Sequence, residues 1–375
     1  MKTITTLVLL GILILLCADI SFAQVNYSQF NYPDAMGGSF GPTGVRGAEG
    51  RENVYVTGAV HPTPPPTPTP ACFVSSHGLL YKGKLNGDGS WTVLDYPSSS
   101  GTTVTNTVLY GPDTLPGGNV RLVGSYTICE ESGTRNHGLL YEGPPDGSGT
   151  WQTIDFPISA ATPSPSPGEQ VLNTIAHSNM GGLVVGNFDT NLATGRAFVY
   201  DVVANSWVEL VKPMAASITA YGIWYNGGTN YTIAGGYADV NFPGIDQHGY
   251  LVNWDSTTQT ASDWTNYDFD NRHISVAVSH FDGITTDNHG GFCLTGDWVS
   301  TIPPDSGAFF AHVRRQPHRA FGDARWTEIA YPSSPGLMVD TTSGNTVFEN
   351  NVLGIYTANG DPTFYGYVAT VRGGR

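Results

Sequence analysis

The sequence predicts an all-β fold made of repeated four-stranded units, and three observations support that prediction. The stretch His77–Pro97, HGLLYKGKLNGDGSWTVLDYP, returns in closely similar form as His137–Pro157, HGLLYEGPPDGSGTWQTIDFP, and fainter copies follow to the end of the chain. Gly, Asn and Asp separate short apolar runs, as expected for tight turns between strands. Long stretches with the 3.6-residue period of an amphipathic helix are absent.

Three strands of each unit are marked by residues that recur six times. A Gly in the second strand is followed two places later by a large residue, at Gly58, Gly124, Gly186, Gly235, Gly296 and Gly354. A small residue opens the third strand, at Gly78, Gly138, Ala197, Gly249, Ala308 and Gly366. An aromatic residue opens the fourth strand, at Tyr27, Trp91, Trp151, Trp207, Trp264 and Trp326. Four short antiparallel strands at a period of about 57 residues are typical of a β-propeller blade, in which recurring aromatics pack between blades.

The fold class is therefore predicted as an all-β, six-bladed β-propeller with four-stranded antiparallel blades. The six repeats are expected near residues 34–97, 98–157, 158–213, 214–270, 271–332 and 333–375 plus 24–33. The last copy stops after its third strand, and an isolated fourth strand stands at Tyr27–Pro33. Pairing of these segments would close the ring through the N-terminal strand and remove the open edges of an arc of sheets. Residues 24–375 are thus expected to form a single domain.

The repeat resembles the extracellular HAF repeat family. The resemblance rests on the pattern h-G-[LF]-L-Y, then G-x-W/F-x-x-I-D-x-P, then an apolar strand ending in G-x-[YF], and it covers nearly all of the chain after residue 23. The G-I-N of the family is degenerate here, as in Thr174-Ile175-Ala176 and Tyr221-Gly222-Ile223. The resemblance implies a secreted or surface β-propeller, and it brings no catalytic residues with it.

Residues 1–23 have the features of a secretory signal peptide. Lys2 supplies the positive start, Leu7–Leu16 the apolar segment and Ser21-Phe22-Ala23 a small-x-small cleavage site. The sequence has no second apolar run of membrane length. We therefore expect a monomeric protein without membrane insertion, exported to the extracellular space, the cell surface or the periplasm.

The three cysteines beyond the signal segment allow one disulfide. Cys72 and Cys129 both fall in the connection between the second and third strands of neighbouring blades, on one face of the ring. A disulfide between them is predicted, because an exported chain meets an oxidising environment. Cys293 lies in an apolar strand and is expected to be a buried thiol.

Charge and motifs narrow the function classes. A net charge of −15 at pH 7 disfavours nucleic acid, which is bound through clustered Lys and Arg. No phosphate-binding loop of the form G-x-x-x-x-G-K-[ST] occurs. Recurrence of His77, His137 and His248 at one repeat position indicates a structural role. No cofactor is expected.

One group of residues has the chemistry of a site. His280 and Asp282 stand two apart on an inner strand, so they share a face, and His289 is expected to return on the next strand. An imidazole beside a carboxylate suits zinc or a general base, but the pair lacks the ligand count of a metal site, so no metal is predicted. Two aromatics outside the repeat pattern, Trp224 and Phe242, are further binding candidates.

Two hypotheses about function remain open. The first is a non-catalytic propeller that presents loops for binding a glycan or a surface protein. Its binding face would carry the irregular insertions, such as His61–Pro70 and Ala161–Gln170. The alternative is a hydrolase or lyase acting on polysaccharide in the central channel. An enzyme requires carboxylates or histidines that converge near the axis. Only Asp282 and Glu349 are expected on the inner strands, which favours the first hypothesis.

Overall fold

The computed structural model describes residues 24–33, 38–48, 52–63, 72–129, 135–240, 247–269, 275–317 and 320–373. Its regular structure is β, apart from short 3-10 turns at Pro116–Gly118 and Ile158–Ala160. Within these residues, no helix is long and apolar enough to cross a membrane. The segment expected to be a signal peptide, residues 1–23, lies outside the described residues.

Twenty-four strands are found in this part of the chain, and the first three groups are consecutive in sequence. One sheet contains β2 (Ser39–Gly47), β3 (Val54–His61), β4 (His77–Gly83) and β5 (Gly89–Val93). The next contains β6 (Val104–Thr114), β7 (Val120–Ile128), β8 (His137–Gly143) and β9 (Thr150–Thr153). A third contains β10 (Val171–Met180), β11 (Leu183–Thr190), β12 (Arg196–Asp201) and β13 (Ser206–Leu210).

The next two groups are joined into an eight-stranded sheet by one parallel bridge, Gln247↔Val278. The first group contains β14 (Ala215–Gly227), β15 (Asn230–Asp239), β16 (Gln247–Asp255) and β17 (Thr260–Tyr267). The second contains β18 (Ser275–Thr286), β19 (Gly291–Ile302), β20 (Pro304–Arg315) and β21 (Phe321–Ile329). All other pairings along these groups are antiparallel, which confirms the predicted all-β fold of four-stranded antiparallel units.

The last sheet combines the two ends of the chain. It contains β22 (Val339–Phe348), β23 (Asn351–Ala358), β24 (Asp361–Arg372) and the N-terminal β1 (Gln24–Gln29), in the order β1-β24-β23-β22. β1 pairs antiparallel with β24, from Gln24↔Arg372 to Gln29↔Tyr367. The sequence predicts this pairing of an isolated fourth strand with the incomplete last copy, and the structure has it.

Buried side chains form six clusters, and each cluster joins two neighbouring groups of strands. One of them joins the last sheet to the first, because Phe30, Leu353 and Val368 pack with Phe40 and Leu79. The recurring tryptophans lie at the borders of these clusters; Trp326, for example, packs edge-on against Phe309. These contacts agree with the scaffold role predicted for the repeated aromatics.

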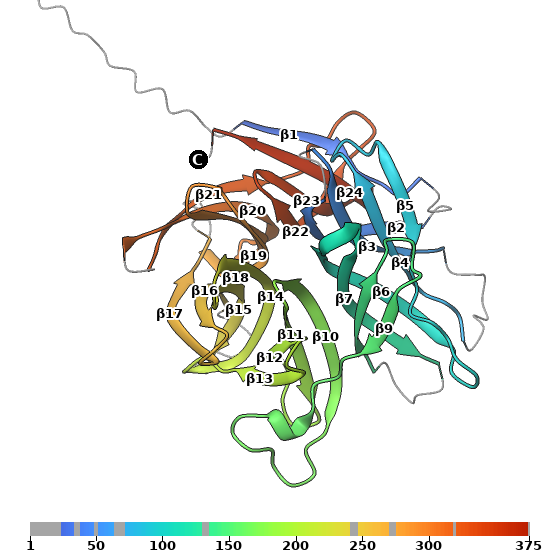
Figure 1. The fold of residues 1–375 in the computed structure, drawn as a ribbon. Helices are drawn as coiled ribbons and strands as arrows, with labels where there is room; N and C mark the ends of the chain where they lie inside the picture. Colours follow the sequence, from blue (N-terminus) through green and yellow to red (C-terminus); the bar gives the residue numbers. More distant parts are fainter. Residues whose placement is uncertain are drawn as a thin grey trace, which may run out of the picture.

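The first strand of each group meets the first strands of its neighbours. β2 packs against β6 and β22, β10 against β6 and β14, and β18 against β14 and β22. Figure 1 shows β5, β13 and β17 at the periphery of the molecule, with β18 and β22 nearer its middle. We call β2, β6, β10, β14, β18 and β22 the inner strands.

Cys72 and Cys129 form the predicted disulfide, between the β3–β4 and β7–β8 connections. Disulfides persist in oxidising compartments, so this bond favours an exported protein. Cys293 on β19 is a fully buried thiol, also as predicted.

Candidate functional site

Each inner strand carries a β-bulge at the same position of the repeat. The register of the inner strand with its partner shifts at this position in every group, and the unpaired residues are Thr43, Tyr110 (with Gly111), His177, Tyr221, Asp282 and Asn345. The recurring Gly of the second strand stands opposite this bulge. A Cβ at Gly124, for example, would lie 2.0 Å from the carbonyl oxygen of Val108. The sequence marker Gly58/124/186/235/296/354 therefore exists because the bulged strand approaches too closely for a side chain.

The bulge residues line one well between the inner strands. Its volume is about 350 Å³. The lining consists of Thr43, Tyr110, His177, Tyr221, His280, Asp282, Asp297 and Asn345. All six inner strands thus contribute a side chain, and all eight residues carry a hydroxyl, imidazole, carboxylate or amide group. None of these eight is Lys or Arg.

Arg46 closes one end of the well. From β2 its guanidinium reaches β14 and β18, donating from Nη2 to the Ile223 carbonyl oxygen at 2.8 Å and from Nη1 to the Ile284 carbonyl oxygen at 3.1 Å. The side chain is buried, and burial lowers its pKa to about 10 despite the nearby Asp113. Arg46 lies beyond Thr43 toward the β2–β3 turn. The open end therefore faces the starts of the inner strands, where the connections after β3, β7 and β15 also lie.

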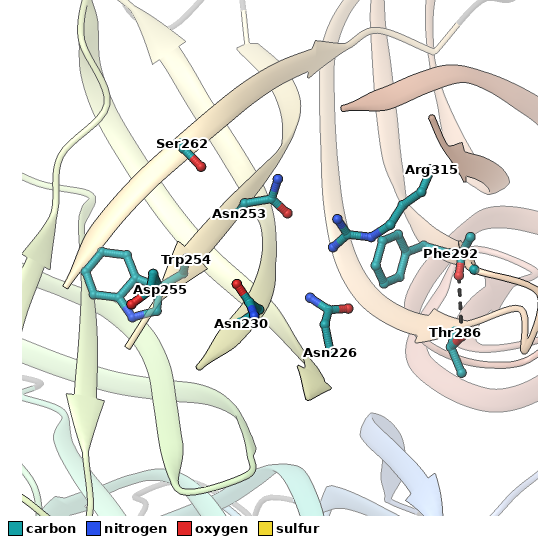
Figure 2. Close-up of a pocket in the computed structure, with 11 residues that line it drawn as sticks. Asn226, Asn230, Asn253, Trp254, Asp255, Ser262, Thr286, Phe292 and Arg315 are labelled. Carbon is teal, nitrogen blue, oxygen red and sulfur yellow. Dashed lines mark hydrogen bonds between the residues drawn. The ribbon is translucent and has the colours of Figure 1, made fainter. Parts of the chain in front are cut away.

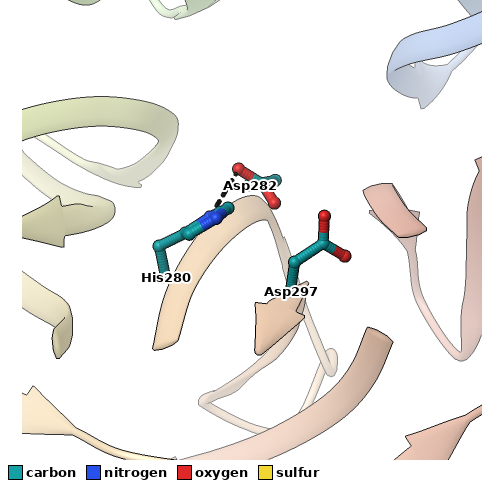
Figure 3. Close-up of side chains that lie close together, drawn as sticks. All are labelled: His280, Asp282 and Asp297. Carbon is teal, nitrogen blue, oxygen red and sulfur yellow. Dashed lines mark hydrogen bonds and ion pairs between the residues drawn. The ribbon is translucent and has the colours of Figure 1, made fainter. Parts of the chain in front are cut away.

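His280, Asp282 and Asp297 are the densest group of titratable side chains in the well. His280 Nδ1 lies 3.0 Å from Asp282 Oδ1, and Asp297 stands opposite His280 on β19. One nitrogen or oxygen atom from each residue lies within 4.8 Å of those of the other two. Figure 3 shows the Asp297 carboxylate on the same side of the hairpin as the His280–Asp282 pair. Asp297 is held in place by Ser343 Oγ at 2.7 Å and by the Gly344 backbone N–H at 2.8 Å.

The crowding of like charges shows in the pKa values of this group. Burial, together with the negative charge of Asp282, raises the pKa of Asp297 to about 6. Burial would lower the pKa of His280, but the two carboxylates outweigh it and raise that pKa to about 9. Two carboxylates thus share a single imidazole as their cationic neighbour among the lining residues.

The other lining side chains are held by neighbours in the well. His177 Nε2 lies 2.5 Å from Asn187 Oδ1, and its ring lies edge-on to those of Tyr110 and Tyr221. Burial lowers the pKa of His177 to about 4, so its imidazole is neutral at pH 7. Burial raises the pKa values of both tyrosines to about 12, so their hydroxyl groups stay protonated and can donate hydrogen bonds.

The structure brings only two of the predicted site residues together. His280 and Asp282 form the expected pair, but His289 does not return on the next strand. It lies in the turn between β18 and β19, where its Nδ1 contacts the Asp287 carbonyl oxygen at 2.8 Å. Trp224 lies at the closed end of the well, with its ring centroid 5.3 Å from the Arg46 guanidinium. Phe242 lies outside the described residues.

The prediction of inner carboxylates needs correction. Glu349, expected on an inner strand, stands in the turn after β22 with φ 53°, where it accepts a long hydrogen bond of 3.5 Å from Asn288. Asp297, on a second strand, was missed. It follows the recurring Gly296, and it is the one residue at this repeat position that lines the well among those that the structure describes.

A second depression lies beside the β14–β15 and β18–β19 turns. It measures about 360 Å³ and is lined by Asn226, Asn253, Asp255, Phe292 and Arg315, among others (Figure 2). Its polar groups serve the local structure. Asp255 accepts backbone hydrogen bonds from its own turn, and Arg315 stacks on Phe292 and donates to Thr232. The polar side chains of the well, in contrast, do not hold any turn in place. We therefore take the well as the candidate site.

Comparison with known proteins found no matching family model and no matching curated protein. Among solved structures, a Trypanosoma rangeli sialidase in complex with the inhibitor DANA has a TM-score of 0.49 at 10% identity, covering 90% of this chain and 55% of the sialidase. A luciferin-regenerating enzyme has a TM-score of 0.46 at 11% identity, covering 93% and 97%. A family 117 glycoside hydrolase from the marine bacterium Zobellia galactanivorans has a TM-score of 0.42 at 12% identity, covering 93% and 91%.

Proposed function

We propose that the chain is an exported, monomeric, six-bladed β-propeller of HAF-type repeats that binds the end of a glycan in its central well. Residues 24–375 would form this single domain, and β1 would close its ring. The cyclic order of the inner strands supports the ring, as does the cluster that joins the last sheet to the first through Phe30, Leu353 and Val368. The disulfide and the signal-like residues 1–23 support export.

The lining of the well carries the proposal about the ligand. Hydroxyl-rich molecules are recognised by side chains that accept and donate hydrogen bonds around aromatic rings. The well offers both, since Tyr110 and Tyr221 stand beside His177, Asp282 and Asn345. The lack of Lys and Arg among the eight lining residues disfavours a phosphate or another anion as the ligand.

The shape of the well suggests which part of a glycan it takes. A volume of about 350 Å³ is near the lower limit for small-molecule pockets, which start at about 300 Å³. Arg46 closes the inner end, so a polymer cannot thread through. A terminal sugar unit, entering from the face that carries the loop insertions, fits both constraints.

Glycan arrays followed by titration calorimetry test this proposal. We expect the wild-type chain to bind a defined set of glycans, and Tyr221→Ala to weaken that binding at least about tenfold, the loss expected for about 1.4 kcal/mol. Tyr225→Ala is the matched control, because Tyr225 lies on the same strand but is 37% exposed and does not line the well. Absence of binding across the array, or equal losses for both variants, would refute the proposal and favour a surface protein as partner.

A second candidate is a hydrolase or lyase acting on polysaccharide, and one observation favours it. The sequence suggested too few acid groups near the axis, but the structure brings His280, Asp282 and Asp297 within 4.8 Å of one another. Paired carboxylates are the usual means of glycoside hydrolysis. Release of reducing ends or unsaturated products from glycans that bind would support this activity. Binding without turnover over days would leave the non-catalytic proposal.

A further inference from the structure

The His280–Asp282–Asp297 group has the composition and spacing of a metal site. Ligands held at 2.0–2.2 Å from one ion lie at most about 4.4 Å apart. The three candidate ligand atoms lie within 4.8 Å of one another, and ligands of a tetrahedral ion stand about 3.4 Å apart, so side-chain shifts of at most about 1 Å each would bring them around one ion. The sequence indicated two ligands, His280 and Asp282 on β18, and the structure adds a third, Asp297 on β19.

The positions of these side chains are fixed by the sheet rather than by a loop. Asp282 is the bulge residue of β18, and Asp297 follows the recurring Gly296 on the paired strand. Ser343 and Gly344 of β22 hold the Asp297 carboxylate by two hydrogen bonds. Metal-binding carboxylates and histidines are commonly oriented by such outer contacts.

The group holds more acid groups than cationic neighbours. Two carboxylates stand beside one imidazole in a recessed well whose other lining residues, Thr43, Tyr110, His177, Tyr221 and Asn345, carry no positive charge, and a metal ion would replace the proton of that imidazole. Arg46 donates its described hydrogen bonds to Ser178 and to backbone carbonyls, not to either carboxylate. Buried charges are normally paired or bound to a metal. His280 Nδ1 contacts Asp282, and among the described residues no partner is found for its Nε2.

We propose that His280, Asp282 and Asp297 bind a divalent transition-metal cation of the zinc or manganese class. One imidazole nitrogen with two carboxylate oxygens suits these ions, whereas calcium and magnesium prefer oxygen ligands alone. Three protein ligands leave coordination positions open toward the well. If the proposed function holds, sugar hydroxyl groups would occupy them; the metal site itself does not depend on that step.

Calorimetric titration of the chelator-treated, full exported chain with ZnCl2, MnCl2 and CaCl2, without any sugar, tests the site. We expect one zinc or manganese ion per chain. Asp297→Asn should weaken that binding by about a hundredfold or more, since even outer contacts to a ligand are worth roughly 10- to 100-fold. Asp305→Asn is the matched control, because Asp305 is exposed on β20 and outside the well; its affinity should equal that of the wild type.

Three results would overturn the metal site: no binding of any of the three ions, equal binding by Asp297→Asn and the wild type, or a preference for calcium over both other ions. Circular dichroism checks that each variant folds. If Asp297→Asn does not fold, Asp282→Asn is compared with the wild type in its place. Failure of the glycan experiment with intact metal binding would refute only the proposed function. Glycan binding that is insensitive to the chelator, with no metal bound, would refute only this inference.

Discussion

Among the described His–Asp contacts, the three pairs at the outer strands recur from unit to unit, whereas the His280–Asp282 pair in the well does not. In the recurring pairs, the histidine at the start of the third strand contacts a carboxylate just after the fourth strand. The Nδ1–carboxylate distances are 2.7 Å for His77–Asp95, 2.7 Å for His137–Asp155 and 2.6 Å for His248–Asp268. In the first two, the same carboxylate also accepts the backbone N–H of the following Gly. These pairs fasten the outer strand of a unit to its neighbour.

The pair in the well has no such copies. At the position of Asp282, the other inner strands carry Thr43, Tyr110, His177, Tyr221 and Asn345. Yet the Gly opposite each of these residues never changes. In this chain, a His–Asp pair that recurs in several units therefore belongs to the scaffold. The candidate site lies at the bulge position, where the residue type varies from unit to unit although the Gly opposite it does not.

The largest effect should follow from removing the strand that joins the chain ends. Deleting Gln24–Gln29 exposes the edge of β24 and removes the packing of Tyr27 against Tyr331 and Tyr367. We expect the melting temperature to fall by roughly 10 °C, since a kcal/mol is worth about 2–4 °C in a large domain. Differential scanning calorimetry measures it, with Ser28→Ala, an exposed substitution on β1, as control. An unchanged melting temperature would show that this strand is dispensable and that recurrence does not mark scaffold.

A smaller but still large loss is expected at the unchanging Gly position. An alanine Cβ at Gly124 would lie 2.0 Å from the Val108 carbonyl oxygen, so the bulge would have to move. We expect Gly124→Ala to cost about 3 kcal/mol in urea unfolding, the upper range for overpacking. In Gly47→Ala the new Cβ would meet Phe348 at an ordinary 3.6 Å, and this control should change little. Equal stabilities for the two variants would remove the link between the glycines and the bulges.

A pH-dependent effect should distinguish the buried histidine of the well from the repeated ones. Burial lowers the pKa of His177 from 6.5 to about 4, and the groups facing it are Asn187, Tyr110 and Tyr221. Between these values the unfolded chain takes up a proton that the folded chain does not. Stability therefore falls as the pH drops from 6.5 through 4, by up to about 3 kcal/mol.

His177→Gln removes this titration, so its stability should fall less over the same pH range than that of the wild type. Urea unfolding at pH 7, 5.5 and 4.5 measures the difference. Parallel pH profiles for the two proteins would mean that the well around His177 is wetter than the structure indicates.

Most of the scaffold could be predicted from the sequence, because the residues that build the scaffold recur in every unit. Gly58 and its copies, the aromatic strand openers and the incomplete last copy indicated the all-β units and the β1–β24 pairing. Cys72 and Cys129 occupy equivalent connections, so their pairing could also be predicted.

The site was predicted only in part, because its residues share a position and not a residue type. His280 and Asp282 were found because their chemistry is conspicuous. Tyr110, His177 and Asn345 have no distinguishing pattern in the sequence. Only the structure shows that they occupy the bulges and line the well. His289 was misplaced because the β18–β19 turn includes it, so that the strand starts two residues later.

One measurement contrasts the two kinds of pair most directly: metal affinity and unfolding free energy, determined in parallel for Asp155→Asn and Asp282→Asn. The scaffold variant should lose about 1–2 kcal/mol of stability, the cost of impaired hydrogen bonds to a partly buried carboxylate, and bind zinc or manganese like the wild type. The well variant should lose the metal and change its stability by only about 1 kcal/mol, because the lost contact with His280 is offset by relief of the repulsion between Asp282 and Asp297. Metal binding that survives in Asp282→Asn, or is lost in Asp155→Asn, would contradict the assignment of the site to the non-recurring residues.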